Sequence, residues 1–335
     1  MTSEVKLKLP NCIYIETTNR CNLTCKSCIH YKDVWEPARE FSLKEVEFIA
    51  DQLPGLDRAV LHGAGEPLLC QELPAIIKYL KSRKATVLFN TNGVLLDGKR
   101  RQALINSGLD ELRVSLDAAS SATYKVIRNS NKFELILKNL RAFSREIKTQ
   151  KIKTPKLSLW FLGHRKNISE LYDFIQLAAS LEISEVYLQR FIYCLDEAGY
   201  GVAKSEYALS DRDPEVINLI ERSHELAQKL GIRLASSGLH NNPLLSIRKN
   251  TAKEAGWKNC YRFNQVLYVT VNGNILPCCM VPFTTTDYHS TIIGNVLKDP
   301  VPDIWFDQKF QKLREQIKTS SPPHFCRGCG VLWSI

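Results

Sequence analysis

Three cysteines near the beginning of the sequence have a spacing that suggests iron–sulfur chemistry. Cys21, Cys25 and Cys28 follow the pattern C-x3-C-x2-C. Three thiolates on one short loop can hold three irons of a cubane cluster and leave the fourth iron without a protein ligand. Three nearby thiols also fit part of a zinc site. The first gap departs from the usual C-x2-C zinc knuckle, so the spacing favours an iron–sulfur cluster.

A second set of cysteines lies in the last part of the chain. Its members are Cys260, Cys278, Cys326 and Cys329. The last two form C-x2-C, and Gly273, within VNGN, lies between the first two. An Asn-Gly hairpin turn, in which glycine adopts a positive φ, would bring the flanking cysteines together. Four thiolates complete a closed site, which suits either structural zinc or an iron–sulfur cluster.

The remaining cysteines are interpreted mainly as packing residues. The chain has 11 cysteines in 335 residues, and cytosolic thiols are kept reduced, so metal or redox chemistry explains them better than disulfides. Cys12 and Cys70 are predicted core residues. Cys194 and Cys279 are placed where either can face an active site, although a lone thiol without an identified base is a weak catalytic signal. Cys279 can also replace Cys278 as a ligand.

Composition and charge indicate a cytoplasmic globular protein. Hydrophobic residues make up 44% of the chain and charged residues 24%, and no apolar run reaches the roughly 18 residues of a membrane span. The N-terminus lacks the features of a secretory signal. The net charge of +10 is scattered along helix-like stretches such as KYLKSRK. This distribution favours solvated helix faces over a nucleic-acid surface.

Alternating strand-like and amphipathic stretches predict the element order of an α/β barrel. Six apolar runs are predicted strands, at residues 12–17, 59–63, 86–91, 112–117, 156–162 and 185–193. The helix candidates between them include SLKEVEFIADQL, CQELPAIIKYLKSRK, DGKRRQALINSG and KFELILKNLRAFSREIK. This order predicts a parallel sheet curled into a partial (β/α)6 TIM-like barrel, with functional loops at the carboxyl ends of the strands.

The alternation stops after about residue 240, which predicts a second, smaller domain. YVTVNGNILPCC predicts two short strands around an Asn-Gly turn, and IWFDQKFQKLREQIK, residues 304–318, predicts one final helix. The predicted domains are therefore a barrel over residues 1–244 and a small α+β iron–sulfur domain over residues 245–335.

The cluster loop also resembles a known family. ETTNRCNLTCKSC resembles the cluster-binding loop of the radical S-adenosylmethionine superfamily, and HGAGEP, NTNG, SLD and YKVIR resemble the motifs that line its cofactor. The resemblance implies that S-adenosylmethionine binds the open iron and is reductively cleaved to a 5′-deoxyadenosyl radical. The cofactor-binding residues that it implies are Gly65, Glu66, Asn92, Ser115 and Arg128. Structural alternatives remain for these types of residue: a tight turn, a helix cap and a surface ion pair.

The second cysteine set has its own resemblance. C-x12-G-x4-C followed by a distant C-x2-C resembles the Twitch extension, the shorter relative of the SPASM domain, which carries an auxiliary 4Fe–4S cluster. The resemblance implies Cys260, Cys278, Cys326 and Cys329 as ligands. Only Cys279 is left over nearby, which makes the shorter form the better match.

The two resemblances imply a radical S-adenosylmethionine enzyme whose auxiliary cluster exchanges an electron with the substrate. Candidate catalytic residues near the barrel mouth are Asp117, Arg190, Asp196 and Glu197, of which Asp117, Arg190 and Glu197 are preferred. For each of them taken singly, an ordinary role as a loop or helix-cap charge is the favoured alternative. The implied electron donor is a reductase, a flavodoxin or a ferredoxin.

Three functions compete at this point. Only about ten residues precede the first strand, which favours a small polar metabolite as substrate, such as a sugar, an aminocyclitol or a nucleoside-like compound. The expected outcome is oxidation, decarboxylation or epimerisation in natural-product biosynthesis. The alternatives are maturation of a ribosomal peptide and a non-enzymatic zinc or electron-carrier protein.

Overall fold

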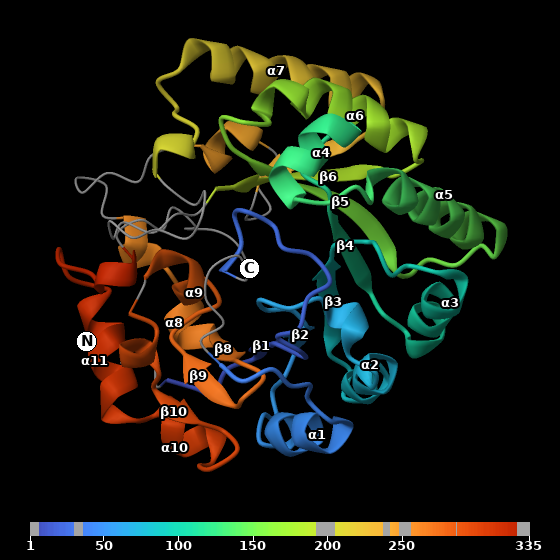
Figure 1. Cartoon of the computed structure of the whole chain (residues 1–335). Helices are drawn as coiled ribbons and strands as arrows, with labels where there is room; N and C mark the ends of the chain where they lie inside the picture. Colours follow the sequence, from blue (N-terminus) through green and yellow to red (C-terminus); the bar gives the residue numbers. More distant parts are fainter. Residues whose placement is uncertain are drawn as a thin grey trace.

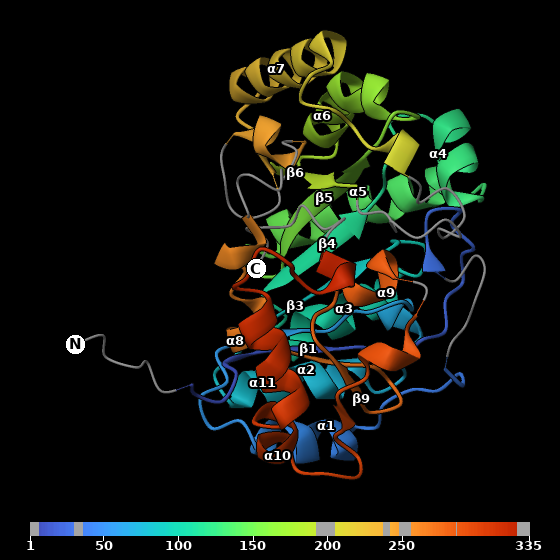
Figure 2. The ribbon, with the colours of Figure 1, turned by 90° about the vertical axis from the view of Figure 1, so that its left-hand side faces the viewer.

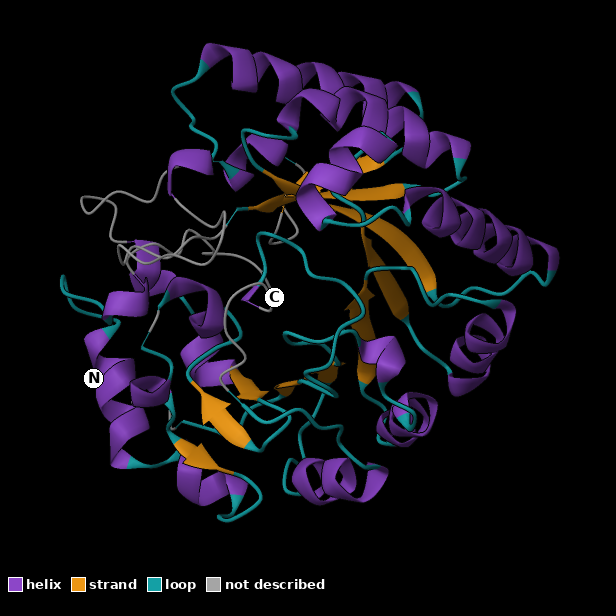
Figure 3. Cartoon of the chain, viewed as in Figure 1, coloured by secondary structure: helices purple, strands orange, loops and turns teal. Residues whose placement is uncertain are grey.

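A curved sheet of parallel strands forms the centre of the protein, with helices on its outer side (Figures 1 and 3). The computed structural model describes residues 7–29, 36–191, 205–236, 242–247, 256–285 and 287–326. The barrel strands are β1 (Cys12–Ile15), β2 (Arg58–Val60), β3 (Thr86–Thr91), β4 (Glu111–Ser115), β5 (Lys156–Gly163), β6 (Glu185–Arg190) and β7 (Arg233–Ser236). They pair in sequence order, each parallel to the next. The predicted partial barrel and its six strands are confirmed, and β7 is an additional strand.

Side chains alternate between the two faces of the sheet. On β4, Leu112 and Val114 are fully buried, whereas Arg113 and Ser115 are only partly buried. Because successive strand residues point to opposite faces, the apolar pair packs beneath the outer helices and the polar pair faces the barrel interior. The interior is therefore polar at the level where the site forms.

The outer helices begin and end at recognisable capping residues. They are α1 (Leu43–Asp51), α2 (Leu73–Ser82), α3 (Gly98–Ser107), α4 (Ser121–Arg128), α5 (Phe133–Thr149), α6 (Leu171–Ser180) and α7 (Pro214–Lys229). Ser42 and Glu45 form a capping box at the start of α1, and Gly108, with a φ of 78°, ends α3. In the described part of the chain, every helix is too short or too polar to cross a bilayer.

The C-terminal region extends the barrel sheet instead of standing apart from it (Figure 2). Its elements are α8 (Arg262–Gln265), β8 (Val266–Val269), β9 (Asn274–Leu276), α9 (Val281–Thr284), β10 (Gly294–Asn295), α10 (Val301–Trp305) and α11 (Gln308–Gln316). Strand β8 pairs in parallel with β1, and β9 and β10 continue the same sheet in antiparallel pairs. Gly273, with a φ of 83°, lies in the β8–β9 hairpin, as predicted. The domain boundary near residue 245 stays a prediction.

The single final helix predicted over residues 304–318 is wrong. Two helices, α10 and α11, occupy this region and are separated at Phe306 and Asp307. The Asp307 side chain accepts a hydrogen bond from the Lys309 amide at 2.7 Å. An aspartate in this position starts a new helix rather than continuing the old one, which the apolar periodicity alone does not reveal.

Candidate functional site

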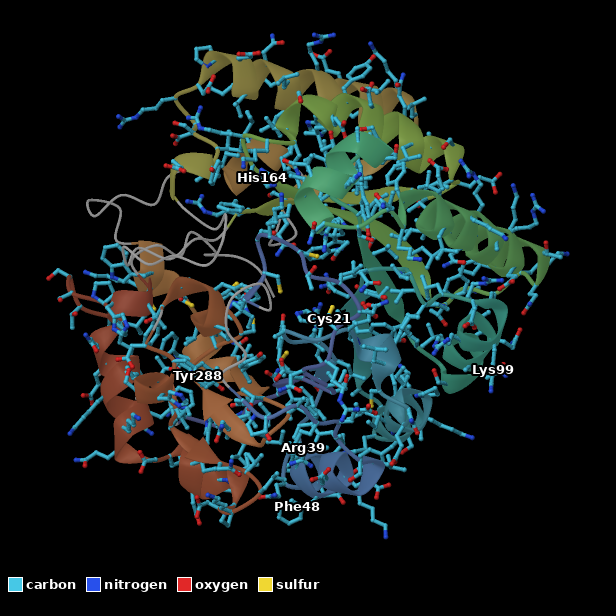
Figure 4. The ribbon with its side chains drawn as sticks, viewed as in Figure 1. Cys21, Arg39, Phe48, Lys99, His164 and Tyr288 are labelled. Atoms are coloured by element: carbon cyan, nitrogen blue, oxygen red, sulfur yellow. The ribbon has the colours of Figure 1, made fainter. Side chains whose placement is uncertain are left out.

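A cavity of about 230 Å³ lies at the carboxyl ends of the barrel strands. It brings together nine of the residues predicted from the sequence. These are Cys21, Cys25, Cys28, Gly65, Glu66, Asn92, Ser115, Asp117 and Arg128. Figure 4 shows Cys21 near the middle of the curved sheet. Residues from the C-terminal region, including Tyr268, Cys279 and Met280, line the same cavity.

Some predicted residues are not placed in this cavity. Arg190 is the last residue of β6 and is not among the described residues that line it. Asp196, Glu197, Cys194 and Cys329 lie outside the described residues. The roles predicted for Arg190, Glu197 and Cys329 therefore stay predictions.

All three loop cysteines line the cavity. Cys25 is buried, and the Cys28 amide donates to the Cys25 carbonyl at 3.0 Å, which forms a tight turn between these two residues. Burial raises the pKa of the Cys21 thiol to about 11, so binding of iron must displace a proton from it. Among the described residues, no three cysteine, histidine or acidic side chains are arranged to hold a single metal ion. The choice between a cluster of several irons and one zinc ion therefore rests on the C-x3-C-x2-C spacing of the three cysteines.

Gly65 allows the loop after β2 to touch the cysteine loop. A Cβ at this position would lie 2.0 Å from the Thr18 carbonyl oxygen and 2.7 Å from that of Arg20. The next residue, Glu66, donates its backbone amide to the Arg20 carbonyl at 2.8 Å. The loop after β2 is thus joined to the cysteine loop at Arg20, the residue before Cys21. Only glycine fits at position 65, because any side chain there would collide with this backbone.

The Glu66 carboxylate is held by the protein itself. It accepts hydrogen bonds from the Thr91 hydroxyl at 2.7 Å, the Asn92 amide at 2.8 Å and the Leu68 amide at 3.2 Å. The bond from Leu68 caps a short 3-10 helix, Pro67–Leu69, as the capping alternative expects. Burial raises the pKa of Glu66. These bonds fix the cavity wall, and a contact of Glu66 with a cofactor stays a prediction.

Asn92 connects the end of β3 to the cysteine loop. Its side-chain amide donates to the Asn22 side chain at 2.7 Å, and its side-chain oxygen accepts from the Val94 amide at 3.0 Å. Asn92 is buried and Asn22 is the residue after Cys21. The cysteine loop is therefore anchored both by the loop after β2 and by the end of β3.

A buried ion pair joins Asp117 and Arg128 beside Cys25. The two side chains approach to 2.5 Å, and Arg128 also donates to the Cys25 sulfur at 3.7 Å. Burial by itself would lower the pKa of Arg128, but the Asp117 and Cys25 charges raise it, so the guanidinium stays charged. Asp117 also accepts from the Leu162 amide at 2.8 Å. Asp117 therefore positions the Arg128 side chain. The role of Asp117 as a catalytic base stays a prediction.

A buried glutamate beside the cavity, Glu16, was not identified from the sequence. Glu16, which is 4% exposed, accepts from the Ala64 amide at 2.6 Å and from the Val271 amide at 3.1 Å. It thereby links the loop after β2 to the C-terminal hairpin. Its position near the carboxyl end of the first predicted strand, residues 12–17, was the available signal. Burial is the main reason that the pKa of Glu16 rises to about 7.

The raised pKa of Glu16 predicts a pH-dependent stability. The folded protein favours the protonated form, so stability is highest below the ordinary pKa near 4.5 and is lost as pH rises through 7. The loss amounts to about 3 kcal/mol. We expect the difference in unfolding free energy between the wild type and Glu16→Gln to move in favour of the variant from pH 5 to pH 8. Chemical unfolding of the iron-free chain across this range measures it, and parallel pH curves would contradict the assignment.

Glu36 fastens the segment after the cysteine loop to the C-terminal region. Its carboxylate accepts from Thr270 at 3.0 Å, Asn272 at 3.0 Å and Asn274 at 2.7 Å, and it also accepts from the Tyr288 hydroxyl. Figure 4 shows Tyr288 within the C-terminal part of the molecule. One carboxylate thus connects two parts of the chain that are remote in sequence.

Replacement of Glu36 by glutamine is expected to lower stability by about 2 kcal/mol or more, because hydrogen bonds to a charged acceptor contribute about 1.5–3 kcal/mol each. The glutamine amide also presents hydrogens to neighbouring donors. The midpoint of thermal unfolding measures this effect. Glu134→Gln is the matched control, since Glu134 is exposed on α5. Equal midpoints for the two variants would show that the contacts of Glu36 add nothing.

The described cysteines of the second set lie on neighbouring elements of the C-terminal region. Cys278 and Cys326 are buried, and Cys260 is partly buried. Cys326 ends a short 3-10 helix, His324–Cys326, that contacts α9, which begins shortly after Cys278. Cys279 is buried and accepts a hydrogen bond from Arg262 at 2.9 Å. The arrangement is consistent with a thiolate site here, and the identity of its ligands stays a prediction.

Comparison with protein-family models gives two matches that together span most of the chain. Residues 15–178 match the radical SAM superfamily model, and residues 260–330 match the SPASM model, described as an iron–sulfur cluster-binding domain. The second match confirms the predicted iron–sulfur type of this region. The preference for the shorter Twitch form stays a prediction.

Curated relatives are similar over nearly the full length. The AdoMet-dependent heme synthase of Methanosarcina barkeri is 23% identical over 96% of this chain and 88% of its own length. The mycofactocin maturase MftC of Mycobacterium tuberculosis is 25% identical over 97% of this chain and 76% of its own length. Because these relatives are enzymes, the non-enzymatic alternative is wrong.

A solved structure supports the same fold. Streptococcus suis SuiB bound to S-adenosylmethionine superposes with a TM-score of 0.71 at 16% identity, covering 92% of this chain and 68% of SuiB. At this identity the likeness concerns the fold, and it agrees with the curved parallel sheet described above. On the family matches, this chain belongs to the radical S-adenosylmethionine superfamily and carries a SPASM iron–sulfur cluster-binding domain.

Proposed function

We propose that this enzyme abstracts hydrogen from a small polar metabolite, such as a sugar, an aminocyclitol or a nucleoside-like compound, in natural-product biosynthesis. The observation that carries this choice is a pair of polar atoms in the cavity wall. His62 Nδ1 and Asn90 Oδ1 are buried and have no hydrogen-bond partner among the described residues. Buried polar atoms are normally paired, so a bound molecule with several polar groups suits this wall. Burial lowers the pKa of His62 to about 3, which leaves its ring neutral.

The cofactors follow from family membership, and the residues proposed to hold them follow from the cavity. The enzyme binds S-adenosylmethionine and a 4Fe–4S cluster, and its SPASM domain binds an additional iron–sulfur cluster. When bound, these groups supply radical hydrogen abstraction. Cys21, Cys25 and Cys28 hold the core cluster, and Arg128 stays beside Cys25 through its pair with Asp117.

The C-terminal side of the cavity suggests how the reaction ends. Tyr268 and Cys279 are buried in its wall and belong to the region that binds the second cluster. A substrate in this cavity would contact residues of the barrel and of the C-terminal region. This position supports net oxidation, decarboxylation or epimerisation with the auxiliary cluster exchanging the substrate electron. A reductase, a flavodoxin or a ferredoxin supplies the electron that starts the reaction.

Peptide maturation is the second candidate. The observation that favours it is the match to mycofactocin maturase, which covers 97% of this chain. A peptide would need to enter the same cavity, because the loop cysteines line it. Both candidates therefore use one machinery and differ only in the molecule that donates hydrogen.

Deuterium transfer from the substrate to 5′-deoxyadenosine distinguishes the two candidates. The protein is reconstituted anaerobically to about eight irons per chain, the content expected for two 4Fe–4S clusters. It is then reduced with dithionite in the presence of S-adenosylmethionine and either deuterated metabolites or deuterated precursor peptides from neighbouring genes. Transfer from a sugar, aminocyclitol or nucleoside supports the proposal. Transfer only from a peptide overturns it in favour of the second candidate.

A further inference from the structure

A buried arginine lies among the cysteines of the C-terminal region. Arg262 is the first residue of α8, and its side chain is almost fully enclosed, with 4% of the residue exposed. Its guanidinium donates to the Cys279 sulfur at 2.9 Å and lies 5.8 Å from the centre of the Tyr14 ring. A guanidinium cannot lose its proton in a protein, so a fixed positive charge is buried at this point.

The surroundings of Arg262 differ from those of a second buried arginine in the same region. Arg314, also 4% exposed, donates to the backbone carbonyls of Phe263 and Trp305 at 2.8 and 2.7 Å. Burial lowers the pKa of Arg314 to about 10.

The side-chain partner of Arg262 is a thiol sulfur instead. Its guanidinium donates to Cys279, and Cys260 lies two residues before it in the chain. The environment of Arg262 is therefore suited to a cation beside thiolates. The environment of Arg314 is suited to a cation held by carbonyl dipoles.

We propose that Arg262 is a positioning residue of the C-terminal iron–sulfur site, where its charge offsets the thiolate ligands and raises the reduction potential of the cluster. This inference rests on the proposed second cluster. Reduction adds one negative charge to a cluster, and a fixed positive charge in a poorly screened interior lowers the energy of that reduced form. Net charge near a cluster is one of the means by which proteins set these potentials. The hydrogen bond to Cys279, the neighbour of the predicted ligand Cys278, holds the guanidinium at the site.

The test measures the midpoint potential of the C-terminal cluster in full-length protein. Cys25→Ala is used as the background in every sample, so that the core cluster does not contribute to the signal. Each sample is reconstituted with iron and sulfide and titrated with dithionite while the electron paramagnetic resonance of the reduced cluster is recorded. We expect Arg262→Met to shift the midpoint to a more negative potential. Arg262→Lys should shift it less, since the charge is kept and only the fork of donors is lost.

Arg314→Met is the matched control, because it removes an equally buried arginine that contacts carbonyls. Its midpoint should equal that of the background. An unchanged midpoint in Arg262→Met overturns the inference. Loss of iron in Arg262→Met and Arg314→Met alike also counts against it, since any buried arginine is then needed for folding. Loss in Arg262→Met alone, with iron kept in Arg262→Lys, supports the need for the charge. A background protein without iron instead refutes the proposed second cluster itself.

Discussion

Replacement of Cys25 by alanine is expected to abolish the dithionite-dependent formation of 5′-deoxyadenosine from S-adenosylmethionine. Cys25 is buried in the cavity wall and its sulfur accepts a hydrogen bond from Arg128. With two loop cysteines left, the core cluster loses a ligand that no other described residue of the loop can replace. Removal of a group that only supports a metal ligand costs about 10–100-fold, and the loss here should exceed that range.

The iron content supplies an independent measurement of the same change. Reconstituted wild type should contain about eight irons and Cys25→Ala about four, if the second cluster is intact. Cys70→Ala is the control, because Cys70 is also buried but lies among core residues outside the cavity. It should keep its iron and its activity. Cleavage of S-adenosylmethionine by Cys25→Ala at the wild-type rate would refute the assignment of the loop cysteines.

Replacement of Gly65 by alanine is expected to displace the cysteine loop and prevent assembly of the core cluster. The added methyl group would lie 2.0 Å from a backbone oxygen of Thr18. A flexible side chain could rotate away from such a contact, but backbone held on both sides cannot. Overpacking typically destabilises a protein by about 1–3 kcal/mol, and the strain here falls on the segment that leads into Cys21. We expect lower iron content, loss of 5′-deoxyadenosine formation and a lower midpoint of thermal unfolding.

Gly55→Ala is the matched control for this substitution. Gly55 lies in the same barrel, and a Cβ at this position meets no atom within 4 Å. The control should keep the iron content, activity and unfolding midpoint of the wild type. If Gly65→Ala assembled a normal core cluster, the close contact between the two loops would not be needed to shape the site.

The parts of the site that could be predicted from the sequence are those whose signal is local. The loop cysteines were identified from their spacing within one short segment, and Gly65 and Glu66 from the resemblance of another short segment, HGAGEP, to a family motif. The rule that parallel strands end at one edge of a sheet is sufficient to bring such segments together. The same local reasoning identified the β8–β9 hairpin through Gly273. The barrel strands were likewise visible as apolar runs.

The parts that could not be predicted depend on partners remote in the sequence. Glu36 joins two parts of the chain only because Thr270 and Tyr288, which are remote in the sequence, fold against it. The residues that neighbour Glu36 in the sequence give no sign of this role. The sequence does not distinguish Arg262 from the other arginines, because its contact with Cys279 exists only in the folded protein. Strand β7, Arg233–Ser236, is a run of four residues that begins with an arginine, which is too short for a clear alternating pattern. Asp117 was predicted as a candidate catalytic residue, and its ion pair with Arg128 becomes visible only in the folded protein.

The parallel pairing of β1 with β8 has a consequence for the order in which the protein can be built. Tyr14 on β1 lies opposite Tyr268 on β8, and at about 5–20 residues per second a ribosome needs roughly 10–50 s to travel from the first to the second. During this time one edge of β1 has no partner strand, and unpaired edges are prone to wrong associations. Glu16, the residue after this strand, also has no bond from the amide of Val271 until that residue is synthesised. The contacts that hold β1 and the residue after it, which lead into the cysteine loop, are thus completed only late in synthesis. We therefore expect the core site to take its final form only after the C-terminal strands have been made.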